Sequence, residues 1–508
     1  MQNFEPSDSP TSQLVGRLST LILILFLLCF RSAFAADIPD PTLDLLLQKG
    51  IITQEEADKA KKEAAALRTN NLPTITESSM WKPNKVLKNL ELFGDVRARY
   101  ETREAFSPPG GKVELDRWRA AIRFGLRGEA LDNFYFGLRV DTSQNPRSPW
   151  ITLGGSNPGP FGKSNTGISV GQAYFGWRWS DWLDITVGKT PNLMYTTPMV
   201  WDPDLNPEGA FERVKYTIGD ADLFFNMGQF LYQDGNPAYS SAGLVSGLPQ
   251  KNDSVFLLGW QGGVNYHFTK TVSAKMGASL YKYFGAQTTN TVTGANLTYV
   301  GEGGFLGPGS GTVNGAAGGN NQTGVNNLLV LEVPMEVNFK IYKFDAKFFG
   351  DIAYNLQGDE RAKEAAAVYS SYIAINNGTL TPFAPQTDDR KAYQVGFSIG
   401  SSNALGLVTG ATAKKHAWEF RTYWQHVEQY ALDPNLLDSD FFEGRGNLEG
   451  IYFAAAYGFS DNFIGTFRYG RANRINDKLG TGGSNLDIPQ VNPISHYDLL
   501  QFDLTFRF

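Results

Sequence analysis

The chain ends in "SHYDLLQFDLTFRF", residues 495–508, and this stretch decides the fold class. From residue 500 onward apolar side chains occupy every second position, with Gln501, Asp503, Thr505 and Arg507 between them. A period of two predicts a strand with one apolar and one polar face. Such a strand at an open edge would favour aggregation, whereas the last strand of a closed barrel pairs with the first. The stretch therefore predicts an all-β fold, a transmembrane antiparallel β-barrel.

The N-terminus has the features of an exported protein. An apolar run over 18–30 follows Arg17 and precedes an Ala-x-Ala pattern ending at Ala35, which predicts a signal peptide over 1–35 with cleavage near Ala35. An anchoring helix is the alternative, but the run is shorter than the roughly 20 residues that a membrane span needs. The only cysteine, Cys29, lies in this segment, so the mature chain is expected to contain no thiol.

The overall composition excludes one class of partner. The 508 residues are 42% hydrophobic and 13% aromatic, with 54 glycines and a formal net charge of -6. Proteins that bind nucleic acid are usually basic, so nucleic acid is not an expected partner. No apolar run of 18 residues follows the predicted signal peptide, and no membrane helix is therefore predicted.

A short helical segment is predicted between the signal peptide and the barrel, over 36–89. Gly50 suits a helix end, and Thr53 with Glu56 forms a capping box for a second helix. The spacing of the following small and apolar residues fits a short coiled coil. We predict a periplasmic helical or coiled-coil segment. It could rest on its own barrel as a hairpin, drive trimerisation, or face the cell wall.

From residue 90 to residue 508 the pattern predicts a barrel of about sixteen strands. The predicted strands lie near 90–104, 115–130, 134–145, 166–180, 183–192, 210–218, 221–233, 254–268, 271–285, 327–341, 343–357, 390–400, 416–431, 448–460, 462–474 and 495–508. Short turns alternate with long loops rich in Gly, Asn and Pro, as in outer-membrane barrels. The connection over 401–416 is long where a short turn is expected. It is either an unusual periplasmic turn or an indication that the predicted number of strands is wrong at this point.

The alternation also assigns the two faces of the barrel. In the second strand Trp118, Ile122 and Phe124 share one side, while arginines occupy the other. A charge at mid-depth on the lipid side costs about 2–4 kcal/mol, so the arginines are predicted to face the lumen. The same sorting predicts an aromatic girdle outside the short-turn rim, made of Trp177, Trp179, Phe268, Phe339, Phe344, Phe459 and Phe463.

The predicted lumen has one strongly basic wall. A barrel of sixteen strands is wide enough for a water-filled channel. The inward positions of its first six strands carry the candidate pore-lining residues Arg97, Arg99, Arg117, Arg119, Arg123, Arg127, Arg139, Arg178 and Arg213. Acidic residues such as Glu101 and Asp141 share these strands and are expected to moderate the field.

Several short motifs together resemble a known family. These are "LLLQKGIITQEEADK" (45–59), "VGKTPN" (187–192), "WDPDLNPEGA" (201–210) and the terminal "FRF". They resemble the bacterial "putative porin" family of sixteen-stranded outer-membrane barrels, and more distantly the phosphate-selective porins. The resemblance covers nearly the whole mature chain. It implies an outer-membrane porin through which small hydrophilic solutes and ions diffuse passively. We predict that this porin is embedded in outer-membrane lipids as a homotrimer.

The loop after the fifth strand is the predicted constriction. In sixteen-stranded porins the third external loop folds into the lumen, and the segment "PNLMYTTPMVWDPDLNPEGAFERV" (191–214) occupies that place. Its acids Asp202, Asp204 and Glu208 would face the arginine wall and create a transverse field that orients polar solutes. The competing interpretation is that arginines and acids only form salt bridges that stiffen the lumen.

Two further functions stay open, and one class is disfavoured. The chain could be a substrate-selective channel for phosphate or another anion, or a barrel that anchors the outer membrane to a periplasmic partner. "GFSIG" (396–400) lies within a predicted strand, whereas a nucleophile elbow needs a strand-to-helix turn. The four histidines are scattered without ligand spacing. We therefore predict no enzyme activity, no catalytic residues, no cofactor and no metal.

Overall fold

The computed structural model describes most of the predicted barrel. The described residues are 49, 53, 87–143, 148–154, 167–234, 254–285, 302–303, 320–321, 325–377, 384–411, 414–483 and 486–508. The predicted signal peptide and, apart from Lys49 and Thr53, the predicted helical segment up to residue 86 lie outside them. The chain divides into a unit over 1–84 and a unit over 85–508, and the second unit contains every strand given below.

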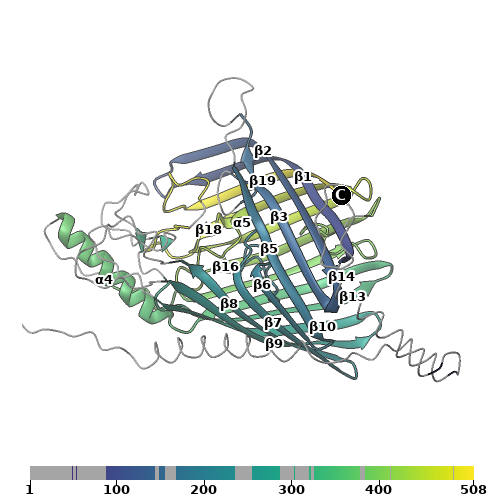
Figure 1. Ribbon diagram of the computed structural model, residues 1–508. Helices are drawn as coiled ribbons and strands as arrows, with labels where there is room; N and C mark the ends of the chain where they lie inside the picture. The colour runs from purple at the N-terminus through teal and green to yellow at the C-terminus, as the bar shows by residue number, and fades with distance from the viewer. Residues whose placement is uncertain are drawn as a thin grey trace, which may run out of the picture. The chain divides into compact units, whose positions relative to one another are not determined.

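Sixteen long antiparallel strands form one closed barrel, which confirms the predicted fold class and strand number (Figure 1). They are β1 (Leu87–Phe106), β2 (Lys112–Ala130), β3 (Phe134–Ser143), β5 (Gly167–Ser180), β6 (Leu183–Lys189), β7 (Glu208–Ile218), β8 (Ala221–Gln233), β9 (Val255–Thr269), β10 (Val272–Gly285), β13 (Leu329–Ile341), β14 (Phe344–Asn355), β15 (Lys391–Gly400), β16 (Trp418–Val427), β17 (Leu448–Gly458), β18 (Phe463–Arg474) and β19 (His496–Arg507). The short strand β4 (Ile151–Thr152) pairs with β2, and β11 (Glu302–Gly303) pairs with β12 (Asn320–Asn321).

The last strand closes the barrel on the first, as predicted. β1 and β19 pair in register from Asp95 opposite Arg507 to Phe106 opposite His496. The backbone of Gly94 and that of Phe508 exchange two hydrogen bonds, of 3.0 and 3.1 Å. A Cβ atom at Gly94 would lie 2.5 Å from the carbonyl oxygen of Arg123 and 2.7 Å from the Phe508 ring, so glycine is needed where the seam ends.

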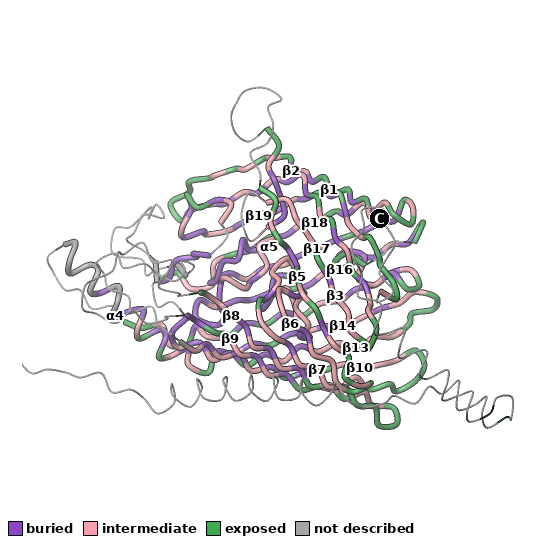
Figure 2. Tube along the Cα trace, in the orientation of Figure 1, coloured by how far each residue is buried: buried purple, intermediate pink, exposed green. Residues whose placement is uncertain are grey.

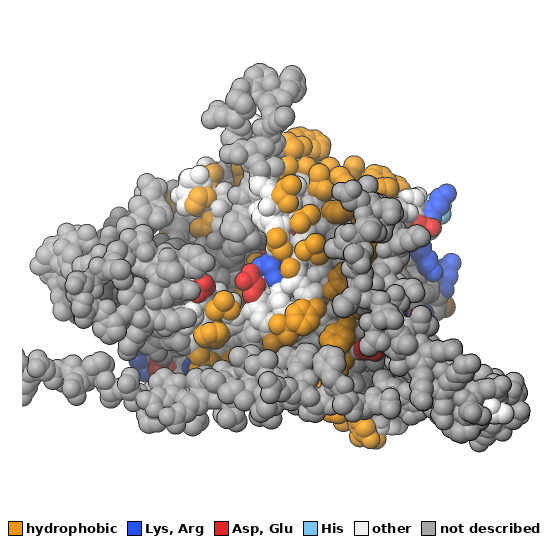
Figure 3. Space-filling model, in the orientation of Figure 1, with side chains coloured by type: hydrophobic (Ala, Val, Ile, Leu, Met, Phe, Trp, Pro, Cys, Tyr) orange, Lys and Arg blue, Asp and Glu red, His pale blue; other side chains and the backbone are white. Residues whose placement is uncertain are grey.

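Buried and exposed positions alternate along the strands, as the period of two predicts (Figure 2). In β19 the Phe502 side chain is 49% exposed, whereas its neighbours Gln501 and Asp503 are buried. In β2 Trp118 and Ile122 are exposed in the same way. Apolar side chains spread over the outer surface of the strands in Figure 3. This exposed apolar surface is the face that a bilayer covers.

The two rims of the barrel differ in loop length. One rim carries tight turns such as the 3-10 turn η1 (Leu131–Asn133), and we call it the short-turn rim. Aromatic residues gather there on the outside. The rings of Trp177 and Trp179 lie 4.6 Å apart, and those of Phe459 and Phe463 lie 5.5 Å apart. We call the opposite rim the long-loop rim.

The helix α4 (Gly358–Asn377) was not predicted from the sequence. It lies in the loop between β14 and β15, at the long-loop rim, and projects from the barrel in Figure 1. Ala362, Ala365 and Ala366 pack against Tyr430 and Leu479 from two other loops. A run of alanines with acidic residues in the first turn was the available helix signal. Among the described residues, no helix has both the length and the apolar character needed to cross a membrane.

A charge on the outer face of β19 should destabilise the barrel. Phe502 lies against the ring of Phe467, with centroids 5.0 Å apart. Phe502→Arg should lower the free energy of unfolding by about 2–4 kcal/mol, because it places a cation in the hydrocarbon layer. Urea unfolding in lipid vesicles, followed by tryptophan fluorescence, measures the change. Phe502→Leu, the matched control, should stay near the native value, and an equally small effect of arginine would contradict the assigned face.

Candidate pore constriction

The loop over 190–207, here called the inner loop, crosses the inside of the barrel from β6. The Tyr195 amide donates to Oε1 of Gln261 on β9 (2.8 Å). The Thr196 hydroxyl donates to Oε1 of Glu332 on β13 (2.5 Å), and the Thr197 hydroxyl to Oδ2 of Asp351 on β14 (2.5 Å). The loop thus bonds to three wall strands, β9, β13 and β14, and β10 separates the first two of these.

A second loop meets the inner loop within the barrel. Residues 428–447, here called the facing loop, connect β16 to β17 and contain the short helix α5 (Ser439–Phe442). The Asp202 amide donates to the carbonyl oxygen of Leu436 (2.6 Å), and the Asp438 amide donates to that of Pro198 (3.1 Å). This loop was not predicted from the sequence, because the alternating pattern extends the preceding predicted strand to residue 431. Asp438, which caps α5, was the local signal available.

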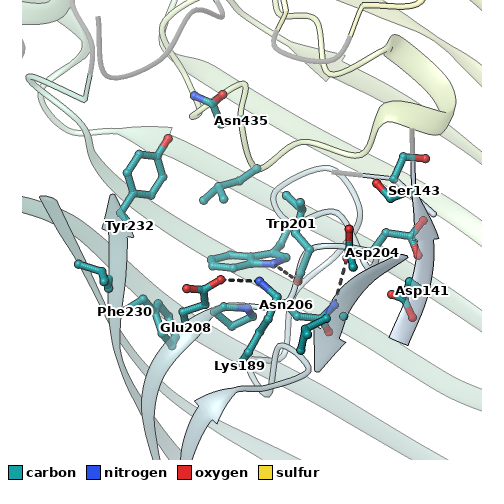
Figure 4. Close-up of a pocket in the computed structure, with 18 of the residues that line it drawn as sticks. Asp141, Ser143, Lys189, Trp201, Asp204, Asn206, Glu208, Phe230, Tyr232 and Asn435 are labelled. Atoms are coloured by element: carbon teal, nitrogen blue, oxygen red, sulfur yellow. Dashed lines mark hydrogen bonds and ion pairs between the residues drawn. The ribbon is translucent and has the colours of Figure 1, made fainter. Parts of the chain in front are cut away.

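Two cavities lie on either side of the joined loops. The cavity toward the long-loop rim, of about 580 Å³, is lined by Trp201, Asn206, Tyr232 and Asn435 among others (Figure 4). The cavity toward the short-turn rim, of about 620 Å³, is lined by strands β1, β2 and β16–β19 and by both loops. Asp204 lines both cavities, so its carboxylate lies where the two spaces approach each other.

The structure distributes the twelve predicted site residues over four places. Seven line the cavity toward the short-turn rim: Arg97, Arg99, Arg123, Arg127, Arg139, Asp202 and Asp204. Arg117 and Arg119 surround the buried carboxylate of Glu101. Arg178 pairs with Glu129 (2.7 Å) and Arg213 with Asp184, both near the short-turn rim. Glu208 lines the other cavity.

Most of these arginines pair with carboxylates of their own wall. The nearest nitrogen–oxygen distances are 2.7 Å for Arg97 and Asp95, 2.8 Å for Arg123 and Asp95, 2.7 Å for Arg127 and Glu91, and 2.8 Å for Arg139 and Asp141. The partners stand two positions along the same strand or directly across to the next one. Much of the positive charge predicted for this wall is therefore compensated locally.

Glu101 is the centre of a dense charge cluster, and it was not among the candidate site residues predicted from the sequence. Its side chain is fully buried and approaches Arg103 (3.3 Å), Arg119 (3.5 Å) and Arg117. Asp487, from the loop between β18 and β19, pairs with Arg117 (2.7 Å). One buried carboxylate and one loop carboxylate thus hold several arginines together.

Three ion pairs join the arginine wall to the inner and facing loops, and the longest joins Arg103 to Glu443 of the facing loop (3.9 Å). Arg123 reaches Asp204 of the inner loop (3.2 Å), and Arg99 reaches Asp440 of the facing loop (2.7 Å). Arg99 also pairs with Asp503 of the closing strand (2.6 Å). The acids of the inner and facing loops therefore meet the wall at three arginines.

Glu208 does not face the arginine wall. It is the first residue of β7 and stands opposite Lys189 of β6 in the strand register. The Lys189 ammonium lies 2.5 Å from its carboxylate, at the edge of the cavity shown in Figure 4. Cross-strand neighbours of opposite charge pair readily, and this pairing diverts Glu208 from the arginines.

The connection over 401–417, here called the long turn, resolves the ambiguity in the strand count. It joins β15 to β16 at the short-turn rim, so the count holds and the connection is an unusually long turn. Leu407 and Val408 are buried and line the cavity beside Arg468. The Arg468 guanidinium donates to the carbonyl oxygen of Val408 (3.3 Å), and that of Arg507 donates to the carbonyl oxygen of Ala411 (2.5 Å). The long turn therefore folds inward across β16 and β17 to reach β18 and β19.

The acids of the two loops differ in their protonation. Burial, together with the neighbouring Asp440 carboxylate, raises the pKa of Asp438 to about 7. Burial and the Asp438 carboxylate raise the pKa of Asp202 well above its ordinary value. Burial opposes ionisation of Asp440 too, but Arg99 and Arg468 outweigh it and lower the pKa of that carboxyl. The charge of the loop junction therefore changes near neutral pH, at Asp438.

Comparison with known families identifies the chain. The model of the family described as "Putative porin" matches residues 109–299 and 325–508. The chain belongs to this porin family. It is therefore an outer-membrane channel protein rather than an enzyme, as the sequence motifs implied. No curated protein matches the chain.

Several solved porins align with this chain at low identity. OmpF of Salmonella typhi, solved in complex with daunomycin, aligns at 10% identity with a TM-score of 0.41, over 84% of this porin and 100% of that chain. A loop-deletion mutant of OmpT, an outer-membrane protein of Vibrio cholerae, aligns at 9% identity with a TM-score of 0.36, over 83% and 99%. A mutant of the Rh. blastica porin aligns at 9% identity with a TM-score of 0.35, over 83% and 100%.

The described part of the porin contains no group of three or more His, Cys, Asp or Glu side chains placed to hold a metal ion.

The selectivity of the porin should depend on pH through Asp438. Lowering the pH from 8 to 6 protonates a carboxyl whose pKa is about 7, so the lumen loses a negative charge and the preference for cations falls. Reversal potentials in a KCl gradient across a planar bilayer measure this change. Asp438→Asn removes the titrating group and should flatten the response. An undiminished pH response of that variant would assign the effect to another group.

Proposed function

We propose that the junction of the inner loop and the facing loop selects among the solutes that this porin passes. The porin itself allows passive diffusion of small hydrophilic solutes and ions across the outer membrane. One observation carries the proposal: Asp204 lines both cavities and pairs with Arg123 at 3.2 Å. A solute that moves from one cavity to the other passes this pair.

The electrostatics of the junction favour small polar solutes. Opposite charges from the wall and the loops create a local field across the passage, which orients dipoles and disfavours apolar molecules. The candidate pore-lining residues Arg97 and Arg99 stand around the same cavity and extend that field. The local pairing of most arginines argues for weak overall ion selectivity.

The same pairing weighs against a phosphate-selective channel. A basic ladder that conducts phosphate needs uncompensated arginines in series, whereas Arg97, Arg123 and Arg139 each have a carboxylate within 3 Å. Conductance that saturates at low phosphate concentration would favour the selective channel. An anchoring role for residues 36–89 is the other alternative, and a deletion that left conductance and envelope integrity intact would count against it.

Neutralising the pair at the junction should change ion selectivity in opposite directions. Arg123→Gln leaves Asp204 without its arginine and should raise the cation-to-anion permeability ratio, whereas Asp204→Asn should lower it. One charge about 4 Å from a passing ion contributes about 1 kcal/mol in water, so the ratio should change on the order of fivefold. Reversal potentials measured in planar bilayers test this.

A matched control lies far from the junction. Arg178→Gln removes an exposed, ion-paired arginine near the short-turn rim and should leave the ratio unchanged. Equal shifts from Arg178→Gln and Arg123→Gln would mean that selectivity reflects the net charge of the lumen and not the junction. Purified native porin that shows no conductance steps would refute the channel function itself.

Two features of the mature protein remain proposals from the sequence. We propose cleavage near Ala35, supported by the apolar run and the Ala-x-Ala pattern, in a Gram-negative host. N-terminal sequencing of the protein from outer membranes tests it. We also propose a homotrimer, supported by the family resemblance, and the mass of the detergent-solubilised protein by light scattering tests that assembly.

A further inference from the structure

Arg421 on β16 is an exception among the arginines of the lumen. It lines the cavity of about 620 Å³, and the residue is 8% exposed. Within the described part of the chain its guanidinium forms no ion pair and no hydrogen bond, and its Nε atom is buried without a partner. A buried cation without a counter-charge is costly, which makes an anion the favoured occupant of the adjacent space.

The missing partner has a structural cause. Elsewhere in the lumen an arginine commonly pairs with an acid two positions away on the same strand, as Arg97 does with Asp95 and Arg139 with Asp141. Glu419 has this position relative to Arg421. Its Oε2 atom instead accepts the backbone amides of residues 406 and 408 in the long turn, at 3.0 and 2.8 Å. The long turn therefore occupies the carboxylate that would otherwise neutralise Arg421.

The surroundings of Arg421 are aromatic and supply two further donors. Its guanidinium carbon lies 4.3 Å from the centre of the Phe349 ring and 5.8 Å from that of Tyr423. The ring of Tyr423 stacks on that of Tyr452 at 4.7 Å. Both tyrosines line the cavity, and neither hydroxyl has a hydrogen-bond partner among the described residues. A guanidinium that stacks on a ring presents its N–H edge sideways.

We propose that Arg421, with the hydroxyls of Tyr423 and Tyr452, forms a binding site for small carboxylate solutes in the short-turn half of the pore. A planar carboxylate matches the N–H edge of a guanidinium and accepts two parallel hydrogen bonds. Arg468 faces the same cavity, one strand beyond Ala454, and pairs there with Asp503. The site rests on the proposed function, because solutes must enter the pore to reach it.

Nearby acids favour a monovalent ligand. Asp438 and Asp440 of the facing loop line the same cavity, and Asp440 is held by Arg99 (2.7 Å). Their charge repels a divalent phosphate more than a monocarboxylate. The apolar side chains of Leu407, Val408 and Ile464 in the cavity lining also suit a carboxylate with an apolar body. Benzoate is therefore an appropriate probe, with inorganic phosphate as its comparison.

Two measurements test the site. Benzoate should reduce the single-channel KCl current of the native porin in a saturable way. Arg421→Gln should raise the half-blocking concentration about tenfold or more, because it removes a charge-assisted bidentate contact. Tyr423→Phe should raise it less. Arg471→Gln removes an exposed, ion-paired arginine that does not line this cavity and should leave it unchanged. Calorimetric titration of benzoate into the detergent-solubilised porin reports binding without requiring conduction.

The outcomes separate the site from the function it rests on. A porin that conducts but whose block and calorimetric binding are the same in Arg421→Gln would overturn the site and leave the channel function standing. Phosphate that blocks at the same or a lower concentration than benzoate would overturn the carboxylate preference. Absence of conduction, with benzoate binding that depends on Arg421, would refute the channel function while supporting the site.

Discussion

The pairing of β1 with β19 is the constraint on which the rest of this porin depends. A bilayer offers no hydrogen-bond partner to a free strand edge, so the sheet is stable there only when it closes. Closure requires Gly94, where the seam ends and a side chain would collide with the carbonyl oxygen of Arg123 on β2 and with the ring of Phe508. Once the sheet is closed, alternate residues of every strand are committed to the lumen. The alternation of the sequence then determines which side chains line the interior.

Charges inside such a barrel need local compensation. The lumen side chains are partly withdrawn from water, and an unpaired arginine there is costly. The closed sheet supplies partners from the neighbouring strand or from two positions along the same strand, which explains the pairs of Arg97 and Arg123 with Asp95. The loops supply the remaining acids, such as Asp204 and Asp440. The wall and the loops therefore act as one electrostatic unit.

The parts of this structure that the sequence predicts are those set by local geometry. Side chains alternate across a strand whatever its neighbours are, so the sixteen strands and the inward direction of Arg117 and Arg123 could be derived from spacing alone. The pairing of Glu208 with Lys189 depends on the register between β6 and β7, which periodicity does not specify. The sequence of the facing loop contains a helix-capping residue, and that of α4 is rich in alanine. These features predict that a helix forms, but they do not predict where it packs.

The long turn shows how a distant backbone segment can determine the chemistry of a wall residue. Alternation alone predicts that Glu419 and Arg421 point inward on the same strand and pair like their counterparts on β1 and β3. The Glu419 carboxylate instead accepts hydrogen bonds from two backbone amides of the long turn. Without this acceptor, two N–H groups folded into the lumen would be left unpaired, which is energetically costly. The cost of satisfying that backbone is an arginine without a counter-ion. Carboxylates of the protein largely neutralise the other arginines of this channel. An anionic solute therefore binds with the least competition from those carboxylates at Arg421.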